Sequence, residues 1–195
     1  LKNPRKASIA ARSPCSACIT GSGMDSAVSV SVTASGSNQR MRDNNLRDLL
    51  CAIYSPFLQR GFDSVVHDVV VQGLPVVFAM DRAGFVGDDG KTHQGFIDIS
   101  FLRCLPNMVI AAPKDERELR DLLYTGVNHS GPFALRYPRG SGPGASTVEP
   151  MRQLPIGRGE VLREGRDVTL VGFGTSVSEC VLAAGILEQS GIDAA

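Results

Sequence analysis

The chain has 195 residues, of which 43% are apolar, and its 20 basic and 20 acidic residues give a formal net charge of zero. This length is sufficient for one domain and part of a second. The neutral balance argues against a nucleic-acid-binding protein, because such domains usually carry a basic excess or stripe. No apolar run approaches the roughly 18 residues that a membrane-spanning helix requires. The five cysteines are scattered and odd in number, which predicts a reducing compartment rather than a secreted disulfide framework.

Residues 1–49 differ in composition from the rest of the chain. They are rich in Ser, and residues 1–24 contain basic side chains but no acidic one, which is typical of an organelle transit peptide. A disordered tail or a misjoined gene model would explain the same composition, so we assign none of this segment to the fold. Cys15 and Cys18 form a C-x-x-C without a second pair or a nearby His, and we interpret the spacing as coincidental rather than as a zinc or redox site.

From residue 49 onward the pattern is that of an α/β domain. Apolar runs predict strands at 49–55, 74–80, 108–112 and 133–137. Apolar residues at helical spacing predict a helix over 57–73, which a Gly ends. A second helix begins with the D-x-x-E capping box of Asp115 and Glu118 and ends at Gly131. Strands that alternate with helices predict a mainly parallel sheet with helices on both faces, and we assign residues 50–140 to this partial domain.

The rest of the chain is predicted to begin a second domain. Residues 141–156 are rich in Gly, Ser and Pro and are interpreted as a linker. The stretch 159–174 predicts two strands around a Glu-Gly-Arg turn, and a helix is expected from about Thr175. We therefore expect residues 157–195 to be the start of a second α/β domain that is cut short.

Two arginines follow predicted strands of the same sheet. Arg82 comes after 74–80, and Arg139 comes after 133–137, whereas Arg136 lies inside the latter strand and is expected to be less available. Parallel sheets bind ligands beyond the carboxyl ends of their strands, so both arginines are expected at one edge. Two converging guanidiniums suit a dianionic phosphate.

The loop after the first of these strands, DRAGFVGDDGKTHQG (81–95), combines ionisable side chains with four glycines. Asp89 and His93 are able to orient hydroxyl groups or relay a proton. Two other interpretations remain open at this point: Arg82 only pairs with Asp89 and holds the loop, or Asp88, Asp89 and His93 form a mononuclear metal site. We assign no metal ligand.

Five sequence blocks carry a resemblance to a known family. They are YSPFLQRGFD (54–63), VVHDV (65–69), DRAGFVGDDGKTHQG (81–95), CLPNMV (104–109) and RYPRG (136–140). In this order and spacing they resemble the 1-deoxy-D-xylulose-5-phosphate synthases, which are transketolase-like thiamine-diphosphate enzymes. The resemblance covers 50–195 and implies the later part of the pyrimidine-binding domain and the opening of the C-terminal domain. The sequence departs from the family pattern at Pro56 and at Phe96-Ile97.

The resemblance implies a transferase that condenses pyruvate with glyceraldehyde 3-phosphate, releases carbon dioxide and feeds isoprenoid, thiamine and pyridoxal synthesis. It implies thiamine diphosphate and Mg²⁺ as cofactors, a soluble homodimer, and a location in the plastid stroma for a plant or alga or in the cytoplasm otherwise. Phe57 would stack on the aminopyrimidine ring, with Arg60 beside it. The acceptor pocket, in which Asp89 and His93 would act in catalysis, would be lined by Tyr54, Arg82, Asp89, His93 and Arg139.

Parts of the family's machinery are missing. The family places a Glu against the aminopyrimidine ring, in a G-I-A-E-Q-H-A stretch before the Tyr-Ser block, yet no Glu occurs here before Glu116. The domain that holds the diphosphate and Mg²⁺ and its G-D-G…N motif are also absent. We therefore expect a fragment of a synthase that is inactive as this chain alone. The alternatives are a non-catalytic phosphate-binding or regulatory module, and a fragment of another transketolase-family enzyme.

Overall fold

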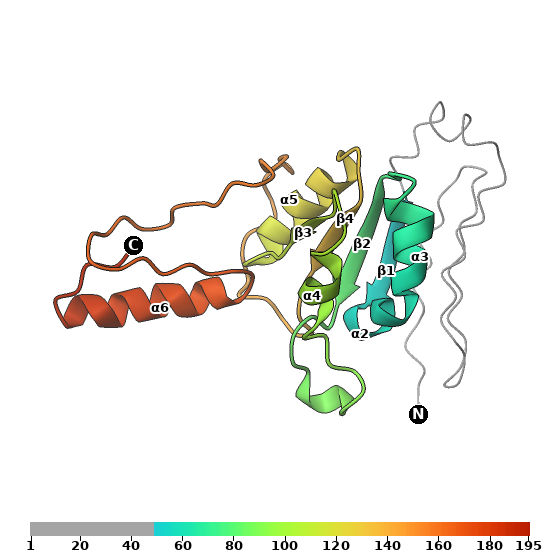
Figure 1. Cartoon of the computed structure of the whole chain (residues 1–195). Helices are drawn as coiled ribbons and strands as arrows, with labels where there is room; N and C mark the ends of the chain where they lie inside the picture. The colour runs from blue at the N-terminus through green and yellow to red at the C-terminus, as the bar shows by residue number, and fades with distance from the viewer. Residues whose placement is uncertain (1–48) are drawn as a thin grey trace.

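The computed structural model describes residues 49–195 (Figure 1). A four-stranded sheet forms its centre, with the order β1-β2-β4-β3 and parallel pairing throughout. The strands are β1 (Leu49–Tyr54), β2 (Val76–Asp81), β3 (Val109–Ala111) and β4 (Phe133–Arg136). These strands and the parallel sheet confirm the prediction. The expectations for Cys15, Cys18 and residues 1–48 lie outside the described residues.

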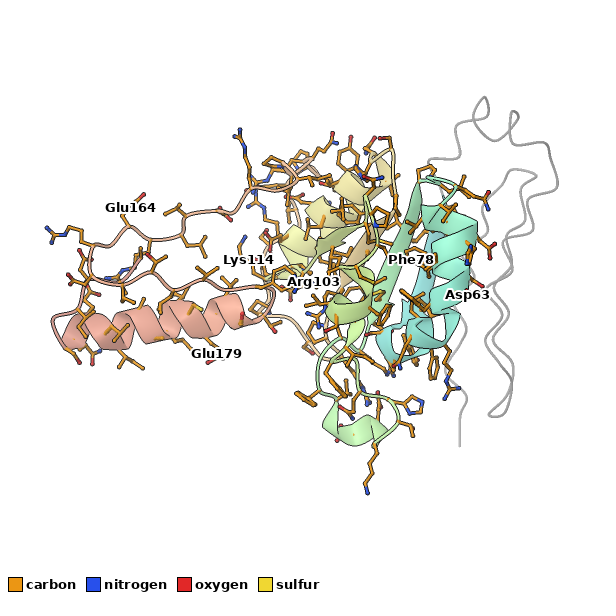
Figure 2. The ribbon with its side chains drawn as sticks, viewed as in Figure 1. Asp63, Phe78, Arg103, Lys114, Glu164 and Glu179 are labelled. Carbon is orange, nitrogen blue, oxygen red and sulfur yellow. The ribbon has the colours of Figure 1, made fainter. Side chains whose placement is uncertain are left out.

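Helices cover both faces of the sheet, because its central strands are apolar on both sides. On one face, Phe78 and Met80 of β2 are buried against the helical segment 55–70 and against α4 (Asp98–Leu102). On the other face, Val77 of β2 and Phe133 and Leu135 of β4 pack against α5 (Glu116–Val127). In Figure 2, Phe78 lies within these layers and Asp63 lies on the outer surface of α3. The predicted α/β class with helices on both faces is confirmed.

The first helical segment changes its winding along its length. It consists of α2 (Ser55–Leu58), a 3₁₀ turn (Gln59–Gly61), α3 (Phe62–Ser64) and a wider π turn (Val65–Val70). Pro56 lies in the first turn, where its missing N–H costs no intrahelical bond. Gly73 has a φ of 62° and follows the end of the segment, as the sequence predicted.

The N-terminus of α5 is capped as predicted. The Asp115 carboxylate accepts from the Glu118 N–H at 2.8 Å, and the Glu118 carboxylate accepts from the Lys114 N–H at 2.6 Å. The predicted end of this helix is wrong, since the helix stops before Gly131. Its last turn is closed by the side-chain amide of Asn128, which donates to the Tyr124 carbonyl at 2.8 Å.

The segment interpreted as a linker contains no helix or strand, but it lies along α5. Arg152 Nε donates to the Asp121 carboxylate at 3.0 Å, and the Leu154 N–H donates to Thr125 Oγ1 at 2.8 Å. Both acceptor side chains are buried. These contacts attach 141–156 to the first domain. The division of the chain into domains at 140 and 157 stays a prediction.

The second region, residues 157–195, extends away from the sheet (Figure 1). Its helix, α6 (Ser176–Gln189), confirms the predicted helix. The two strands predicted over 159–174 are wrong, because this stretch forms only an isolated parallel bridge between Val168 and Ala194. The Leu170 N–H donates to the Ala195 carbonyl at 2.7 Å, and the Ala195 N–H donates to the Val168 carbonyl at 2.8 Å. A strand needs neighbours for its backbone groups, and the described residues provide little more than this contact.

Candidate functional site

The candidate site lies where β1, β2 and β4 end. The register places Tyr54 opposite Asp81 and Met80 opposite Arg136, so the carboxyl ends of the three strands are adjacent. The loop 82–95, green in Figure 1, leaves β2 at this edge and projects beyond the sheet. Side chains that are far apart in the sequence therefore meet here, as expected for a parallel sheet.

Asp89 joins the two predicted arginines. Arg82 Nε donates to Asp89 Oδ2 at 2.5 Å, and a guanidinium nitrogen of Arg139 donates to Asp89 Oδ1. Arg82 and Asp89 are largely shielded, with side chains 18% and 17% exposed, whereas the Arg139 side chain is 44% exposed. The predicted convergence of the arginines is therefore present, and so is the pairing of Arg82 with Asp89. The convergence of the arginines and the pairing of Arg82 with Asp89 therefore occur in one arrangement, centred on the Asp89 carboxylate.

Arg82 is held from several sides. Its second nitrogen, Nη1, donates to Asp81 at 2.7 Å, and its guanidinium carbon lies 3.8 Å from the centre of the Tyr54 ring. Its φ of 57° is in the left-handed region, which is rare for a residue other than Gly. Burial raises the pKa of Asp81, although Arg82 acts in the opposite direction. Burial alone would lower the pKa of Arg82, but the hydrogen bond to Asp89 and the nearby negative charges raise it.

An aromatic group lies beside these charges. The rings of Tyr54 and Phe57 are stacked with centroids 5.3 Å apart, and the rings of Phe57 and His93 meet edge to face with centroids 5.2 Å apart. His93 Nδ1 also contacts Thr92 Oγ1 at 2.9 Å. The structure thus brings Tyr54, Phe57 and His93 together with the arginine pair.

The loop is closed at its base by a pair of glycines. Gly84 and Gly95 exchange two backbone hydrogen bonds of 2.8 Å. A Cβ on Gly95 would overlap the Arg82 carbonyl and lie 2.6 Å from Ser55 Oγ, so only Gly fits there. Inside the loop, the Gln94 side chain accepts from the Val86 N–H at 2.6 Å and donates to the Val86 and Gly90 carbonyls. The sequence analysis missed Gln94, because an amide in a polar loop carries no signal of such contacts.

A buried carboxylate lies under the site. Asp98 is 1% exposed and accepts from Ser55 Oγ at 3.0 Å, Arg136 Nε at 2.9 Å and the Ile99 N–H at 2.8 Å. Asp98 therefore connects Ser55, which follows Tyr54, to Arg136 of β4, which lies shortly before Arg139. The sequence analysis missed Asp98 as well, whereas the expectation that Arg136 is not available agrees with this ion pair.

One expectation, the role of Arg60, and one open alternative, the metal site, find less support in the geometry. Arg60 lies in the 3₁₀ turn after α2, is exposed and makes no ion pair with residues 49–195. Among the same residues, no group of three side chains that could hold a metal ion is found. Asp89 faces two arginines, so the metal site considered for Asp88, Asp89 and His93 is not formed.

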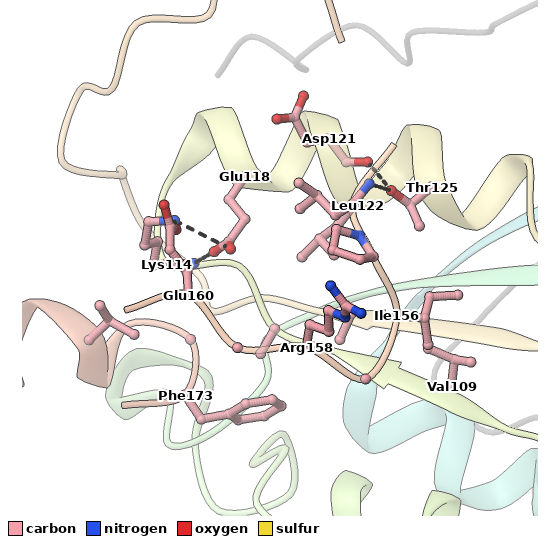
Figure 3. Close-up of a pocket in the computed structure, with 18 of the residues that line it drawn as sticks. Val109, Lys114, Glu118, Asp121, Leu122, Thr125, Ile156, Arg158, Glu160 and Phe173 are labelled. Carbon is pink, nitrogen blue, oxygen red and sulfur yellow. Dashed lines mark hydrogen bonds and ion pairs between the residues drawn. The ribbon is translucent and has the colours of Figure 1, made fainter. Parts of the chain in front are cut away.

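A separate cavity of about 870 Å³ lies between α5 and the second region (Figure 3). None of the predicted site residues lines it. Most of its charged groups are paired: Lys114 contacts Glu118 at 3.3 Å and Glu160 at 2.9 Å, and Arg152 contacts Asp121 at 3.0 Å. We interpret this cavity as a junction within the chain rather than as the ligand site.

Comparison with known proteins decides the family. Residues 39–144 match the family described as the transketolase pyrimidine-binding domain, and residues 157–195 match the transketolase C-terminal domain. The chain belongs to the transketolase family. Its sheet is thus part of the fold that thiamine-diphosphate enzymes of this family share.

Curated relatives of this transketolase-family chain include two synthases of the same name. The chain is 60% identical over 146 residues to the 1-deoxy-D-xylulose-5-phosphate synthase of Thermomicrobium roseum, and 57% identical over 144 residues to that of Microcystis aeruginosa. The matches cover 74% and 73% of this chain but only 23% of either relative. The chain therefore spans about a quarter of the length of these curated synthases, which its sequence resembles as predicted.

The fold also matches solved transketolase structures. A structure described as a split-gene transketolase, an inactive beta4 tetramer, is similar with a TM-score of 0.66 and 31% identity over 74% of this chain and 46% of that chain. No helix within residues 49–195 is long and apolar enough to cross a membrane.

Proposed function

We propose that this chain provides the acceptor-binding side of a 1-deoxy-D-xylulose-5-phosphate synthase. The reaction condenses pyruvate with glyceraldehyde 3-phosphate and releases carbon dioxide. The observation that carries the proposal is that Arg82 and Arg139 meet at one edge of the sheet. The chain that contains them is 60% identical to a curated synthase over 74% of this chain. A non-catalytic phosphate-binding module would use the same two arginines but would not need the aromatic group beside them.

The phosphate of the acceptor is proposed to bind between the two arginines. Arg82 is oriented by Asp81 and by the Tyr54 ring, so its guanidinium is fixed before a ligand arrives. Arg139 follows β4 and is more exposed, which suits a group that closes on the ligand. A planar fork of N–H donors matches phosphate oxygens in a way that a lysine does not.

Asp89 and His93 are proposed to act at the aldehyde and hydroxyl end of the acceptor. Both belong to the loop that the Gly84–Gly95 pair closes. An imidazole held against Phe57 is in a position to give a proton to a carbonyl oxygen or take one from a hydroxyl. The loop would also exclude water from the reacting atoms.

The described residues fit one end of thiamine diphosphate and not the other. The stacked pair of Tyr54 and Phe57 offers an aromatic face for the aminopyrimidine ring, and Arg60 is proposed at the edge of that ring. When bound, the cofactor supplies the electron sink for decarboxylation of pyruvate. The stretch 49–115 contains no Glu for the aminopyrimidine, and no metal-ligand group is found in the part of the chain that is described, so we assign no residue to the diphosphate or to Mg²⁺.

The remaining parts of the proposal rest on the family resemblance. They are a homodimer, and a plastid location for a plant or algal protein or a cytoplasmic one otherwise. We also expect the 195-residue chain on its own to show no turnover with pyruvate, glyceraldehyde 3-phosphate, thiamine diphosphate and Mg²⁺, since the groups that activate and anchor the cofactor are not among the residues assigned above.

The phosphate site is tested by NMR titration of the ¹⁵N-labelled chain with inorganic phosphate. We expect Arg82→Ala and Arg139→Ala each to weaken binding by at least about tenfold, because each removes a charge-assisted contact. Arg103→Ala is the matched control, since Arg103 is exposed beyond the end of α4, away from the loop (Figure 2). Equal effects of all three variants would show a general charge effect and contradict the site.

The activity is tested in a chimera. The 146 residues of the Thermomicrobium roseum synthase that align with this chain are replaced by the residues of this chain. We expect the chimera to form the product, and Arg82→Ala in it to lower kcat/KM for glyceraldehyde 3-phosphate by about a hundredfold. A folded chimera that binds phosphate but forms no product would refute the synthase while leaving the phosphate site intact.

A further inference from the structure

The carboxylate of Asp89 lies where an anionic ligand would bind. Each of its oxygens accepts from a different guanidinium, Oδ2 from Arg82 and Oδ1 from Arg139. We call this pair of arginines the anion seat. A phosphate that used the same Arg82 Nε and Arg139 donors would have to replace Asp89, because a donor already directed at one oxygen is not free for another.

We propose that Asp89 is a built-in competitor for the anion seat and raises the concentration that any anion needs in order to bind there. The proposal rests on the proposed function, since it assumes that the two arginines receive the phosphate. It adds a role for Asp89 that precedes any contact with the substrate's hydroxyl or carbonyl group: in the free protein, the side chain occupies the seat.

The surroundings make Asp89, rather than Arg82, the group that moves. Arg82 is held by Asp81 and by the Tyr54 ring in addition to Asp89. Asp89 lies at the end of a short 3₁₀ turn, η3 (Gly87–Asp89), and Gly90 follows it with a φ of 74°. The loop is fixed on either side of this turn, by Gln94 at Val86 and Gly90, so the tip can change conformation while the base stays in place.

Competition of this kind sets a threshold for binding. The apparent affinity of a ligand is its intrinsic affinity multiplied by the fraction of molecules in which the seat is free. A monoanionic carboxylate, such as that of pyruvate, offers the arginines only what Asp89 already provides. A phosphate carries nearly two negative charges and three acceptor oxygens, so it gains contacts when it replaces Asp89. Asp89 lowers the affinity of both anions by the same factor, so phosphate, with the higher intrinsic affinity, still binds at concentrations at which a carboxylate does not.

The test compares two neighbouring acids that carry the same charge. Asp89→Asn removes the competitor, and Asp88→Asn is the matched control because Asp88 is exposed and makes no ion pair with residues 49–195. Each variant is titrated with inorganic phosphate and with acetate, and the backbone amides of Gly84 and Gly95 are followed by NMR. We expect Asp89→Asn to strengthen binding of both anions by roughly tenfold, and Asp88→Asn to change either by less than about twofold.

The outcomes separate the two proposals. If the parent chain binds phosphate and Asp89→Asn binds it equally or more weakly, the competitor is refuted and the anion seat stands. If neither the parent chain nor Asp89→Asn binds phosphate, the anion seat is refuted, and the proposed competition by Asp89 is refuted with it. In the double variant Arg82→Ala/Asp89→Asn, the gain in anion affinity should be lost. A gain that persists in the double variant would show that it does not arise at the anion seat. The amide signals of β2 report whether each variant is folded, and Asp89→Ser replaces Asp89→Asn if that variant is not.

Discussion

Two regions of the molecule contain similar apolar stretches that end in different structures. LPVVFAM (74–80) becomes β2, whose residues from Val76 to Met80 are buried between β1 and β4. VTLVGFG (168–174) forms no strand, and its Val171 and Phe173 are 87% and 49% exposed. The two stretches differ because β2 has a hydrogen-bonded strand on each side, whereas 168–174 has none within residues 49–195. An apolar run therefore predicts a strand only where the rest of the fold provides partners.

The helices of the two regions show the same contrast. α5 packs one partly buried apolar stripe, formed by Leu119, Leu122 and Leu123, against the sheet. α6 exposes apolar side chains along its length, and Val181, Leu182 and Ile186 are all more than half exposed. Such a helix has the composition of one that is covered on several sides. The helix lies within residues 157–195, which match the transketolase C-terminal domain.

The largest expected effect tests whether only the sheet region is a packed core. Phe78 is 1% exposed, whereas Phe173 of the second region is 49% exposed. Phe78→Ala should lower the free energy of unfolding by about 3–5 kcal/mol through lost burial and a cavity. Phe173→Ala should change it by less than about 0.5 kcal/mol. Urea unfolding followed by circular dichroism measures both, and similar losses would mean that the second region is as well packed as the first.

The next effect compares a buried ion pair with an exposed one. Asp98→Ala leaves Arg136 and Ser55 without their acceptor and should cost about 3 kcal/mol of unfolding free energy. Asp193→Ala removes the partner of Arg166, whose side chain is 89% exposed, and should cost at most about 1 kcal/mol. The same urea titrations apply, and a smaller loss for Asp98→Ala than for Asp193→Ala would contradict the account of the buried carboxylate.

A smaller pair of effects concerns two glycines. Gly95→Ala places a methyl group against Ser55 and the Arg82 carbonyl and should destabilise the chain by about 2 kcal/mol. Gly185 lies inside α6 with no atom near the position of an added Cβ. Gly185→Ala should therefore stabilise by about 0.5–1 kcal/mol, through the higher helix propensity of Ala. Thermal unfolding should shift in opposite directions, and a shift in the same direction would refute the comparison.

The smallest effect involves an ion pair that links the two regions. Hydrogen bonding to Lys114 lowers the pKa of Glu160, so this carboxylate contributes stability above its ordinary pKa and loses it as the pH falls through the lowered value. Because Glu160 is more than half exposed, Glu160→Gln should cost less than about 0.5 kcal/mol at pH 7. The difference from the parent should vanish in strong acid. A difference that grows on acidification would contradict the direction of the shift.

Much of the sheet region could be predicted from local patterns. Apolar runs located β1 to β4, helical spacing located α5 and α6, and alternation indicated parallel pairing. Parallel pairing in turn placed Arg82 and Arg139 at one edge. The prediction failed over 159–174, because an apolar run carries information about burial but none about whether a neighbouring strand is present. It also failed at the end of α5, where Asn128 closes the last turn ahead of Gly131.

The sequence by itself determined the type and order of the elements, because helix and strand periodicities are properties of adjacent residues, and it determined that charged groups follow β2 and β4. Only the tertiary structure decided which of those groups meet. Asp89 bridges two arginines that lie 7 and 50 positions away along the chain, and Asp98 receives hydrogen bonds from Ser55 and Arg136, at 43 and 38 positions. Such contacts depend on how the strand ends are brought together in space. That arrangement is set by packing throughout the core, so it cannot be predicted from the contacting residues alone.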